Sequence, residues 1–233
     1  MKVLLTGKNS KDIEDLVKSF GFEITALNPD AVISYGGDGT LLSSERTYPG
    51  IPKLPIRNSL VCKKCPDHKE EVLLKNLAEG RLKIKQYSKL ETTIFYQKLL
   101  ALNDFVIRNA TPIHTIRFKT NQEEKLLIGD GIVLSTPFGS TGYFKSITGK
   151  TFKSGFGIAF NNTTEKTAPS FFKDNDKVTF KLIRGTATLS FDNNPDLLKV
   201  DEGSQITFKL SEEKAKIFEL ESLRCPKCIV TRG

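Results

Sequence analysis

The apolar positions of the first 80 residues repeat with the periods of alternating strands and helices. Residues 2–6, 23–27 and 31–35 form short apolar runs, which are typical of buried strands. Between the first two runs, apolar residues recur at helical spacing over residues 13–20, and Gly21 ends that segment. A second helical pattern covers residues 72–78, after a capping-box-like pair, Asp67 and Glu70. This order predicts an α/β domain, in which ligands bind at the carboxyl ends of the strands.

From about Arg81 onward the period of the pattern changes from 3.6 to 2. Arg184 and Gly185 separate two alternating runs, residues 178–182 and 187–191, which predicts a β-hairpin. Further strand candidates are residues 92–96, 99–107, 114–119 and 126–136. Short strands separated by turn residues indicate an antiparallel β-sandwich. We therefore expect an α/β domain at residues 1–85, joined by the tail 211–233, and an all-β domain at residues 86–210.

A glycine-rich segment lies between the apolar run at 31–35 and a helix expected to begin with Leu41. It reads Gly36-Gly37-Asp38-Gly39-Thr40. Glycines allow phosphate oxygens to approach backbone N–H groups without a Cβ in the way. A carboxylate beside phosphate is repulsive unless it holds a metal ion or accepts a proton from an attacking hydroxyl. Asp38 therefore indicates phosphoryl transfer, although an ordinary Asp-Gly turn is the alternative.

Two polar residues, Asn103 and Asp104, interrupt the apolar run at residues 99–107. Buried polar groups need hydrogen-bond partners. Ribose hydroxyls and a purine edge would supply such partners. The alternative is a bulge or a turn between two shorter strands.

Hydroxyl residues and glycines are concentrated in residues 135–143, directly after an Asp-bearing strand at 129–134. Such a loop offers N–H and O–H donors with little steric bulk. Tyr143 ends the loop with a flat ring on which a base could stack. The position of the loop between two ordered segments favours ligand binding over a plain connection.

The four cysteines occur as two C-x-x-C pairs. They are Cys62 with Cys65 and Cys225 with Cys228. In a cytosolic chain, two such pairs provide the four thiolates of one closed, structural zinc site. Two disulfides are the alternative. His68 could replace one cysteine ligand, but a surface histidine is the simpler interpretation.

Charge and hydropathy limit the class of protein further. The 233 residues include 35 basic and 27 acidic side chains, a net charge of +8. This surplus favours an anionic partner, such as a nucleotide, polyphosphate, nucleic acid or an acidic membrane face; a lysine-rich solvated surface explains it equally well. The sequence contains no run of 18 apolar residues, and its apolar start is short for a signal peptide. We expect a cytoplasmic protein.

Taken together, the glycine segment, the Asn103-Asp104 pair and residues 129–143 resemble the NAD kinases, in which similar motifs occur in this order. The resemblance covers roughly residues 31–146. It implies phosphorylation of the adenosine-ribose 2′-hydroxyl of NAD to give NADP, with ATP or polyphosphate as donor and Mg²⁺. It also implies a homo-oligomer.

The resemblance also implies roles for individual residues. Asp38 would deprotonate the ribose hydroxyl or hold Mg²⁺. The donor phosphates would be bound by Gly36, Gly37, Gly39, Thr40 and Arg57. The dinucleotide would be bound by Asn103, Asp104, Asp130, Thr141, Gly142, Tyr143 and Ser146.

Several residues depart from the family pattern. Gly142 stands where the family usually has alanine, and Arg57 lies in a segment that is usually glycine-rich. The chain therefore resembles a divergent member. Alternatives are a lipid or sugar kinase with the same glycine segment, and a non-catalytic zinc-ribbon relative that binds nucleotide or nucleic acid.

Overall fold

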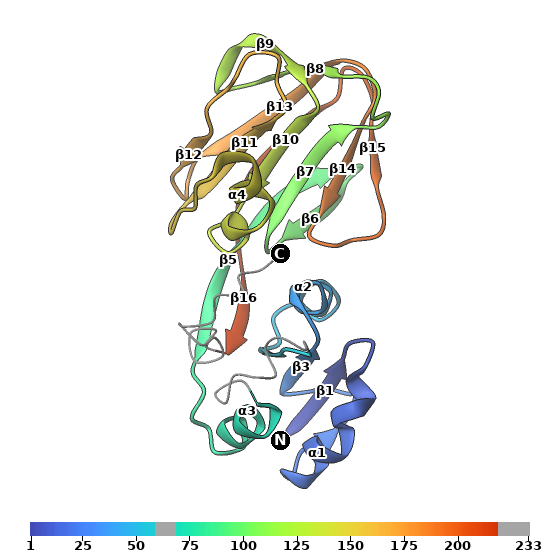
Figure 1. Cartoon of the computed structure of the whole chain (residues 1–233), viewed down its shortest axis with the longest axis vertical. Helices are drawn as coiled ribbons and strands as arrows, with labels where there is room; N and C mark the ends of the chain where they lie inside the picture. The colour runs from blue at the N-terminus through green and yellow to red at the C-terminus, as the bar shows by residue number, and fades with distance from the viewer. Residues whose placement is uncertain (59–68, 219–233) are drawn as a thin grey trace. The chain divides into compact units, whose positions relative to one another are not determined.

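The computed structural model describes residues 1–58 and 69–218, and these divide into two compact units (Figure 1). The first unit contains the described residues up to Tyr87 and those from Lys214 onward, and the second unit is Ser88–Glu213. Two long strands, β5 (Ile84–Ile94) and β16 (Gln205–Phe218), carry the chain from one unit to the other. None of the helices in these ranges is long and apolar enough to cross a membrane.

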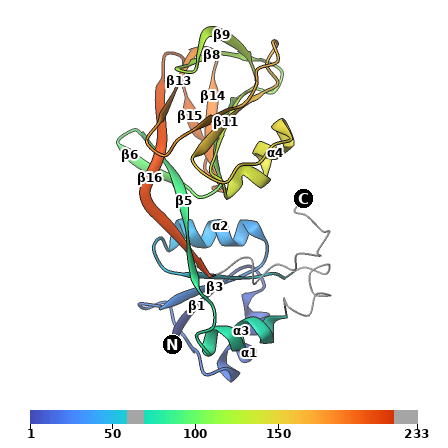
Figure 2. The same ribbon diagram turned by 90° about the vertical axis from the view of Figure 1, so that its left-hand side faces the viewer.

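The first unit is a parallel sheet with helices on both faces, as the alternating pattern predicts. Its strands are β1 (Lys2–Thr6), β2 (Glu23–Ile24), β3 (Ala31–Tyr35) and β4 (Lys53–Ile56), in the order β2-β1-β3-β4. Figure 2 shows α2 (Asp38–Thr47) on one face and α1 (Glu14–Ser19) with α3 (Glu70–Ala78) on the other. All five residues of β3 are buried, because helices cover both of its sides. A short 3₁₀ turn, η1 (Ser10–Ile13), precedes α1.

A buried ion pair fixes α2 against the sheet. Glu45 of α2 pairs with Lys53 of β4, and the Lys53 side chain is fully buried. The Lys53 ammonium also donates to the carbonyl oxygen of Tyr48 at 2.5 Å. Removing one partner of such a pair leaves an uncompensated buried charge, which is strongly destabilising. The pair therefore holds in place the helix that begins with Asp38.

The second unit is a β-sandwich. One sheet has the order β12-β11-β10-β7-β14-β15, and the other contains β16-β13-β8-β9 with β5 and β6 beside it. The strands of the first sheet are β7 (Asp104–Asn109), β10 (Gly131–Ser135), β11 (Phe156–Asn161), β12 (Ser170–Phe172), β14 (Ala187–Phe191) and β15 (Leu198–Val200). The remaining strands are β6 (Gln97–Ala101), β8 (Ile116–Thr120), β9 (Glu123–Gly129) and β13 (Lys177–Arg184). The predicted fold class, α/β plus an antiparallel sandwich, is thus confirmed.

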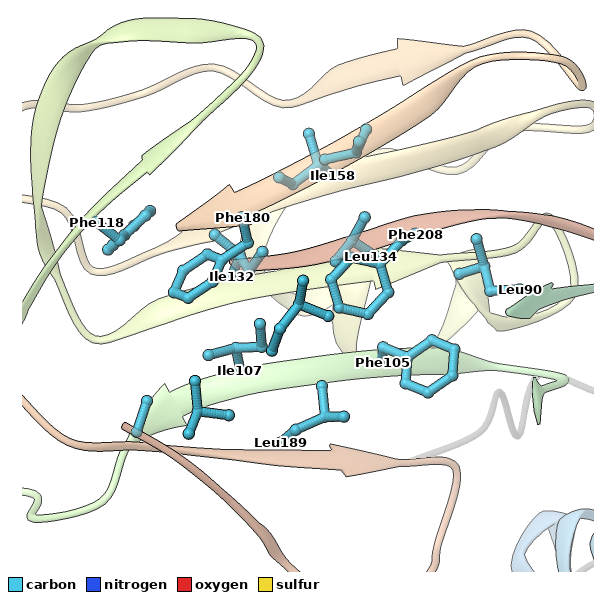
Figure 3. Packing of buried hydrophobic residues seen from close by; sticks show 14 of the residues in the cluster. Leu90, Phe105, Ile107, Phe118, Ile132, Leu134, Ile158, Phe180, Leu189 and Phe208 are labelled. Carbon is cyan, nitrogen blue, oxygen red and sulfur yellow. The ribbon is translucent and has the colours of Figure 1, made fainter. Parts of the chain in front are cut away.

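Apolar side chains from the two sheets interlock to form the core of the second unit (Figure 3). The Phe105 ring lies 5.3 Å from the Phe208 ring and 5.6 Å from the Phe191 ring, measured between centroids. Phe118 and Phe180 stack at 5.3 Å. These contacts join strands that are far apart in the sequence, so the core forms only when the sandwich closes.

Strands β7 and β10 are buried on both faces. Their second face carries Val106 and Val133, which pack with Phe144 of α4 (Tyr143–Thr148) in a smaller apolar cluster. Both faces therefore require apolar residues, and the two strands read as continuous apolar runs instead of alternating ones.

The predicted hairpin at Arg184-Gly185 is wrong. Strand β13 pairs with β8 and β16, whereas β14 pairs with β7 and β15 in the opposite sheet. Gly185, with φ +101°, makes the turn that crosses between the sheets. Both strands bury alternate residues in the same intersheet core. Their alternation is therefore the same as that of a hairpin, and the pattern cannot distinguish the two arrangements.

Two expected long strands are each divided in the structure. The run at residues 99–107 forms β6 and β7, with Asn103 in the bend between them. The run at 126–136 forms β9 and β10, which separate at Asp130. The prediction of one strand over residues 99–107 is therefore wrong. The alternative prediction, a turn between two shorter strands at Asn103-Asp104, is correct.

Replacing Phe105 with alanine should destabilise the protein by about 3–5 kcal/mol, because a large cavity would remain in a closed core. Urea unfolding of both proteins measures this difference. Phe95→Ala is the matched control, since 76% of the Phe95 side chain is exposed. That variant should differ from the parent by less than about 0.5 kcal/mol. Equal effects of the two substitutions would contradict the assigned core.

Candidate functional site

The glycine segment connects β3 to α2. Gly36 follows the strand, Gly37 is the N-cap of α2, and Asp38 is the first residue of the helix. The helix thus begins three residues before Leu41, where the sequence pattern placed it. An acidic side chain in the first turn interacts favourably with the helix dipole, which supports the earlier start. Gly39 and Thr40 consequently belong to the helix and not to a loop.

The glycines of this segment have different roles. A Cβ at Gly36 would lie 2.3 Å from Thr40 Oγ1, so a larger residue does not fit. At Gly37 a Cβ would meet no atom within 4 Å. The space beside Gly37 is therefore open to a ligand that approaches the backbone.

Gly7 is a second glycine that the local structure requires, and the sequence pattern did not identify it. It follows β1, has φ +122°, and its Cβ would lie 2.1 Å from the Tyr35 carbonyl oxygen. Only glycine permits this close approach next to the glycine segment. The sequence signal that could have identified Gly7 is its position directly after β1, the strand next to β3.

Asp38 and Arg57 form an ion pair. Arg57 Nη2 donates to Asp38 Oδ1 at 3.1 Å, and Arg57 follows β4, the neighbour of β3. The side chains are 40% and 24% exposed for Asp38 and Arg57, respectively. Partly exposed pairs contribute little to stability. The pair therefore places a carboxylate and a guanidinium group at the carboxyl ends of adjacent strands, where ligands bind in α/β sheets.

In the second unit, the carboxylate of Asp192 fixes the backbone around Asn103. Asp192 accepts hydrogen bonds from the N–H groups of Leu102 at 2.9 Å, Asn103 at 2.7 Å and Asp104 at 3.4 Å. The N–H of Asp192 in turn donates to the Asp104 carbonyl oxygen at 3.1 Å. The sequence pattern assigned no individual role to Asp192. Its partners lie about 90 positions earlier in the chain, so the sequence carried no local signal of this role.

Residues 135–140 support the same bend from the other side. Thr136 Oγ1 donates to the Leu102 carbonyl oxygen at 2.6 Å, and the Thr136 N–H donates to the Asn103 carbonyl oxygen at 2.9 Å. A Cβ at Gly139 would lie 2.2 Å from the Asn103 carbonyl oxygen. Ser140 Oγ donates to the Pro137 carbonyl oxygen at 2.8 Å. Several hydroxyls expected to bind a ligand are therefore used to build the site.

The second half of the loop expected at residues 135–143 is largely helical. Thr141 ends a 3₁₀ turn, η4 (Gly139–Thr141), Gly142 caps α4, and Tyr143 is the first residue of that helix. Tyr143 packs in part against the small apolar cluster around Phe144, which limits the ring face available to a base. Ser146 Oγ donates to the Tyr143 carbonyl oxygen at 2.7 Å.

Asp130 lies apart from this cluster. Gly131 pairs with Arg108 near one end of β7, whereas Ser135 pairs with Asp104 at the other. The six residues of β7 separate the two ends by about 17 Å. The Asp130 carboxylate accepts a hydrogen bond from Asn162 Nδ2 at 3.0 Å. Within the second unit, the structure therefore does not bring Asp130 together with Asn103.

The Asp104 carboxyl has an unusual acidity. Burial, and secondarily the charge of Asp192, raises the pKa of Asp104 from 3.8 to about 7. The side chain is 7% exposed. Near neutral pH, Asp104 therefore exists in both the protonated and the ionised form, so it can act as either a donor or an acceptor.

All four cysteines and His68 lie outside the described residues, and so does Asp67. Within residues 1–58 and 69–218, no group of three or more His, Cys, Asp or Glu side chains is arranged to hold a metal ion.

Replacing Asp104 with asparagine should change the pH dependence of stability. The folded protein keeps the Asp104 proton up to about pH 7, whereas an ordinary aspartate releases it near 3.8. The stability that protonated Asp104 contributes to the folded state is present below pH 3.8 and is lost as the pH rises to 7. At about 1.4 kcal/mol per pKa unit, Asp104→Asn should be a few kcal/mol more stable at pH 8 and show a flatter profile.

Urea unfolding between pH 4.5 and 8 measures this effect. The control is Asp174→Asn, an exposed aspartate of the same unit. The control should retain the pH dependence of the parent. A parent-like slope in Asp104→Asn would show that burial of this carboxyl does not govern the profile.

No protein-family model matches the chain, but known proteins named NAD kinase are similar to it in sequence. NAD kinase from Sulfurisphaera tokodaii is 32% identical over 160 residues, which cover 64% of this chain and 63% of that protein. NAD kinase from Latilactobacillus sakei is 34% identical over 61% of this chain and 60% of its own length. NAD kinase 2 from Bacillus subtilis is 26% identical over 93% of this chain and 89% of that protein. The chain thus spans less than two thirds of the length of the Sulfurisphaera and Latilactobacillus proteins.

Solved structures share the fold. An NAD kinase from Archaeoglobus fulgidus in complex with ATP superposes with a TM-score of 0.78 at 23% identity, over 96% of this chain and 95% of that one. Yeast NADH kinase complexed with NADH gives a TM-score of 0.79 at 15% identity, over 99% of this chain and 85% of that one. The chain is thus similar in sequence to NAD kinases, and it shares their fold.

Proposed function

We propose that the protein transfers a phosphoryl group from ATP or polyphosphate to the adenosine-ribose 2′-hydroxyl of NAD, giving NADP. The observation that carries this proposal is the position of Asp38, at the start of α2 and next to a glycine backbone. Sequence relatives named NAD kinase support the substrate, and the ATP complex of the Archaeoglobus enzyme supports the donor.

The glycine segment is proposed to bind the donor phosphates. The first backbone N–H groups of a helix have no partner within the helix, and they attract anions. The open space beside Gly37 allows a phosphate oxygen to approach this backbone. Gly36, before the helix, and Gly39 and Thr40, in its first turn, remain proposed phosphate-binding residues beside Gly37.

Asp38 is proposed as the general base. Its carboxylate accepts the proton of the 2′-hydroxyl while the hydroxyl oxygen attacks the terminal phosphorus of the donor. The bond between that phosphorus and its bridging oxygen breaks, and the donor leaves with one phosphate fewer. Arg57, which pairs with Asp38, orients the carboxylate and carries a charge that can bind an arriving phosphate. Phosphoryl transfer depends mainly on such positioning and charge neutralisation.

Mg²⁺ fits this donor set. Proteins commonly bind Mg²⁺ through one or two carboxylates together with the phosphates of the substrate. The partly exposed carboxylate of Asp38 provides one such ligand beside the proposed phosphate site. A bound Mg²⁺ would neutralise the negative charge that develops on the phosphates.

The cluster of the second unit is proposed to bind the dinucleotide. The side chain of Asn103 is half-buried and lies on a backbone that Asp192 and Thr136 hold rigidly. Its amide can donate to and accept from a ribose or an adenine edge. Asp104, Thr141, Gly142, Tyr143 and Ser146 remain proposed ligands beside it, and Asp130 is proposed with them only from the family resemblance.

Asp38→Asn should lower the rate of NADP formation by about 100- to 10,000-fold, as expected for loss of a general base. The assay follows NADP with purified protein, NAD, Mg²⁺ and either ATP or polyphosphate. Asp15→Asn, an exposed aspartate of α1, is the control and should keep the parent rate. Unchanged thermal unfolding of both variants ensures that folding is not the cause. Failure of the parent protein to make NADP with any donor would refute the substrate assignment.

We also propose that Cys62, Cys65, Cys225 and Cys228 bind one structural Zn²⁺. The support is their C-x-x-C spacing, which is typical of closed four-thiolate sites. Elemental analysis should find about one zinc per chain. Replacing Cys62 and Cys65 with serine should release the metal and lower thermal stability. Four titratable thiols in a metal-free protein would contradict the proposal.

A further inference from the structure

One face of the sheet that contains β8 and β13 carries basic side chains that have no acidic partner among the described residues. Alternate residues of β8 and of β13 point to solvent, because the residues between them, such as Phe118 and Phe180, fill the core. A register shift between Leu182 and Arg184 exposes Arg184 as well. The exposed cations are Arg117, Lys119, Lys177, Lys181 and Arg184, which we call the cationic face. None of these five residues forms an ion pair with a described residue. The two strands lie side by side in the second unit (Figure 1).

The cations of this face oppose one another in pairs. Lys181 lies directly opposite Lys119, and Arg184 lies opposite Arg117. Like charges placed opposite each other on neighbouring strands are destabilising. A further pair, Lys177 and Lys209, is relieved because Lys209 contacts Glu91 at 3.0 Å. The structure therefore maintains two unrelieved like-charge pairs, which an anion would stabilise.

A hollow adjoins one of these pairs. It has a volume of about 630 Å³ and lies at the Arg117–Arg184 end of the cationic face. Its lining comprises Thr111, Ile113, His114, Thr115, Ile116, Arg117, Arg184, Gly185 and Thr186. The hollow therefore combines two guanidinium groups with three threonine hydroxyls. Among the described lining residues there is no phenylalanine or tyrosine, and the ring of His114 is the one aromatic group.

The walls of the hollow are held by hydrogen bonds. Asn109 Nδ2 donates to the carbonyl oxygens of Thr111 at 3.1 Å and His114 at 2.8 Å. The N–H of Ala110 donates to the Thr186 carbonyl oxygen at 2.9 Å. Glu202 accepts from the N–H of Gly185 at 3.2 Å but forms no ion pair with either arginine in the described chain. The hollow is thus formed without a ligand, which reduces the cost of binding one.

We propose that this hollow of the second unit binds an oligophosphate chain, at a site separate from the Asn103 cluster. Guanidinium groups bind phosphate oxygens through pairs of parallel hydrogen bonds, and threonine hydroxyls add neutral donors. Asn109 and Asp104 lie at opposite ends of β7, so the hollow is about 17 Å from the Asn103 cluster of the same unit. The phosphate chain can belong to an inorganic oligophosphate or to a nucleotide.

Isothermal titration of the full chain with inorganic tripolyphosphate and, separately, with ATP tests this assignment. Each titration is fitted with two sites, because the glycine segment is also proposed to bind donor phosphates. The alanine variant combines Arg117→Ala with Arg184→Ala, and the lysine variant combines Arg117→Lys with Arg184→Lys. The control variant combines Lys75→Ala with Lys83→Ala. The control removes two exposed charges of the first unit. The alanine variant should bind tripolyphosphate at least about tenfold more weakly, because each charged hydrogen bond contributes roughly that factor. The lysine variant should be intermediate, since it keeps the charge but not the paired donors.

The titrations distinguish the two sources of phosphate. Equal weakening for tripolyphosphate and ATP assigns the site to the phosphate chain itself, and weakening for ATP alone assigns it to a nucleotide. Parent-like binding of both anions by the alanine variant would overturn the proposal, as would an equal loss in the control.

Melting temperature provides a second readout that a folding defect cannot imitate. Without anion, the alanine variant should be at least as stable as the parent, because the like-charge pair is gone. Tripolyphosphate should raise the melting temperature of the parent more than that of the alanine variant. The Asp38→Asn variant should bind in the hollow like the parent, so this test is independent of the proposed kinase activity.

Discussion

Backbone N–H groups that leave a sheet must find new acceptors, and both clusters of the candidate site are built on this constraint. In the second unit the chain leaves β6, and the carboxylate of Asp192 accepts from three consecutive N–H groups. In the first unit the chain leaves β3 and turns at Gly37 into α2, and the start of a helix attracts anions. One strand end is thus closed by a protein carboxylate, whereas the other is suited to an external anion.

Charged side chains of this protein occur in three arrangements, which differ in how deeply the charges are buried. Glu45 and Lys53 are buried and paired, because an isolated charge would be too costly there. Asp38 and its arginine partner are paired but partly exposed, so a phosphate or Mg²⁺ can compete for them at little cost in stability. The cations of β8 and β13 are exposed and unpaired within the described chain, which is tolerable in water but favours an anionic ligand.

The elevated pKa of Asp104 connects stability with the proposed chemistry. A carboxyl that is buried beside another carboxylate destabilises the folded state when it ionises. Proteins retain such groups where they serve a purpose, and perturbed pKa values cluster at functional sites. The bend itself is well held, because Thr136 donates a hydrogen bond to its backbone and Asp192 accepts hydrogen bonds from it.

Sequence by itself determined the two fold classes, because the periods of 3.6 and 2 reflect which face of each element is buried. It also located the glycine segment and the Asn103-Asp104 pair, whose residue types are unusual for their surroundings. Tertiary structure alone decided that β13 and β14 lie in different sheets, that Asp192 supports Asn103, and that Arg57 contacts Asp38. These are contacts between distant segments, and a local pattern specifies burial but not the partner that provides it.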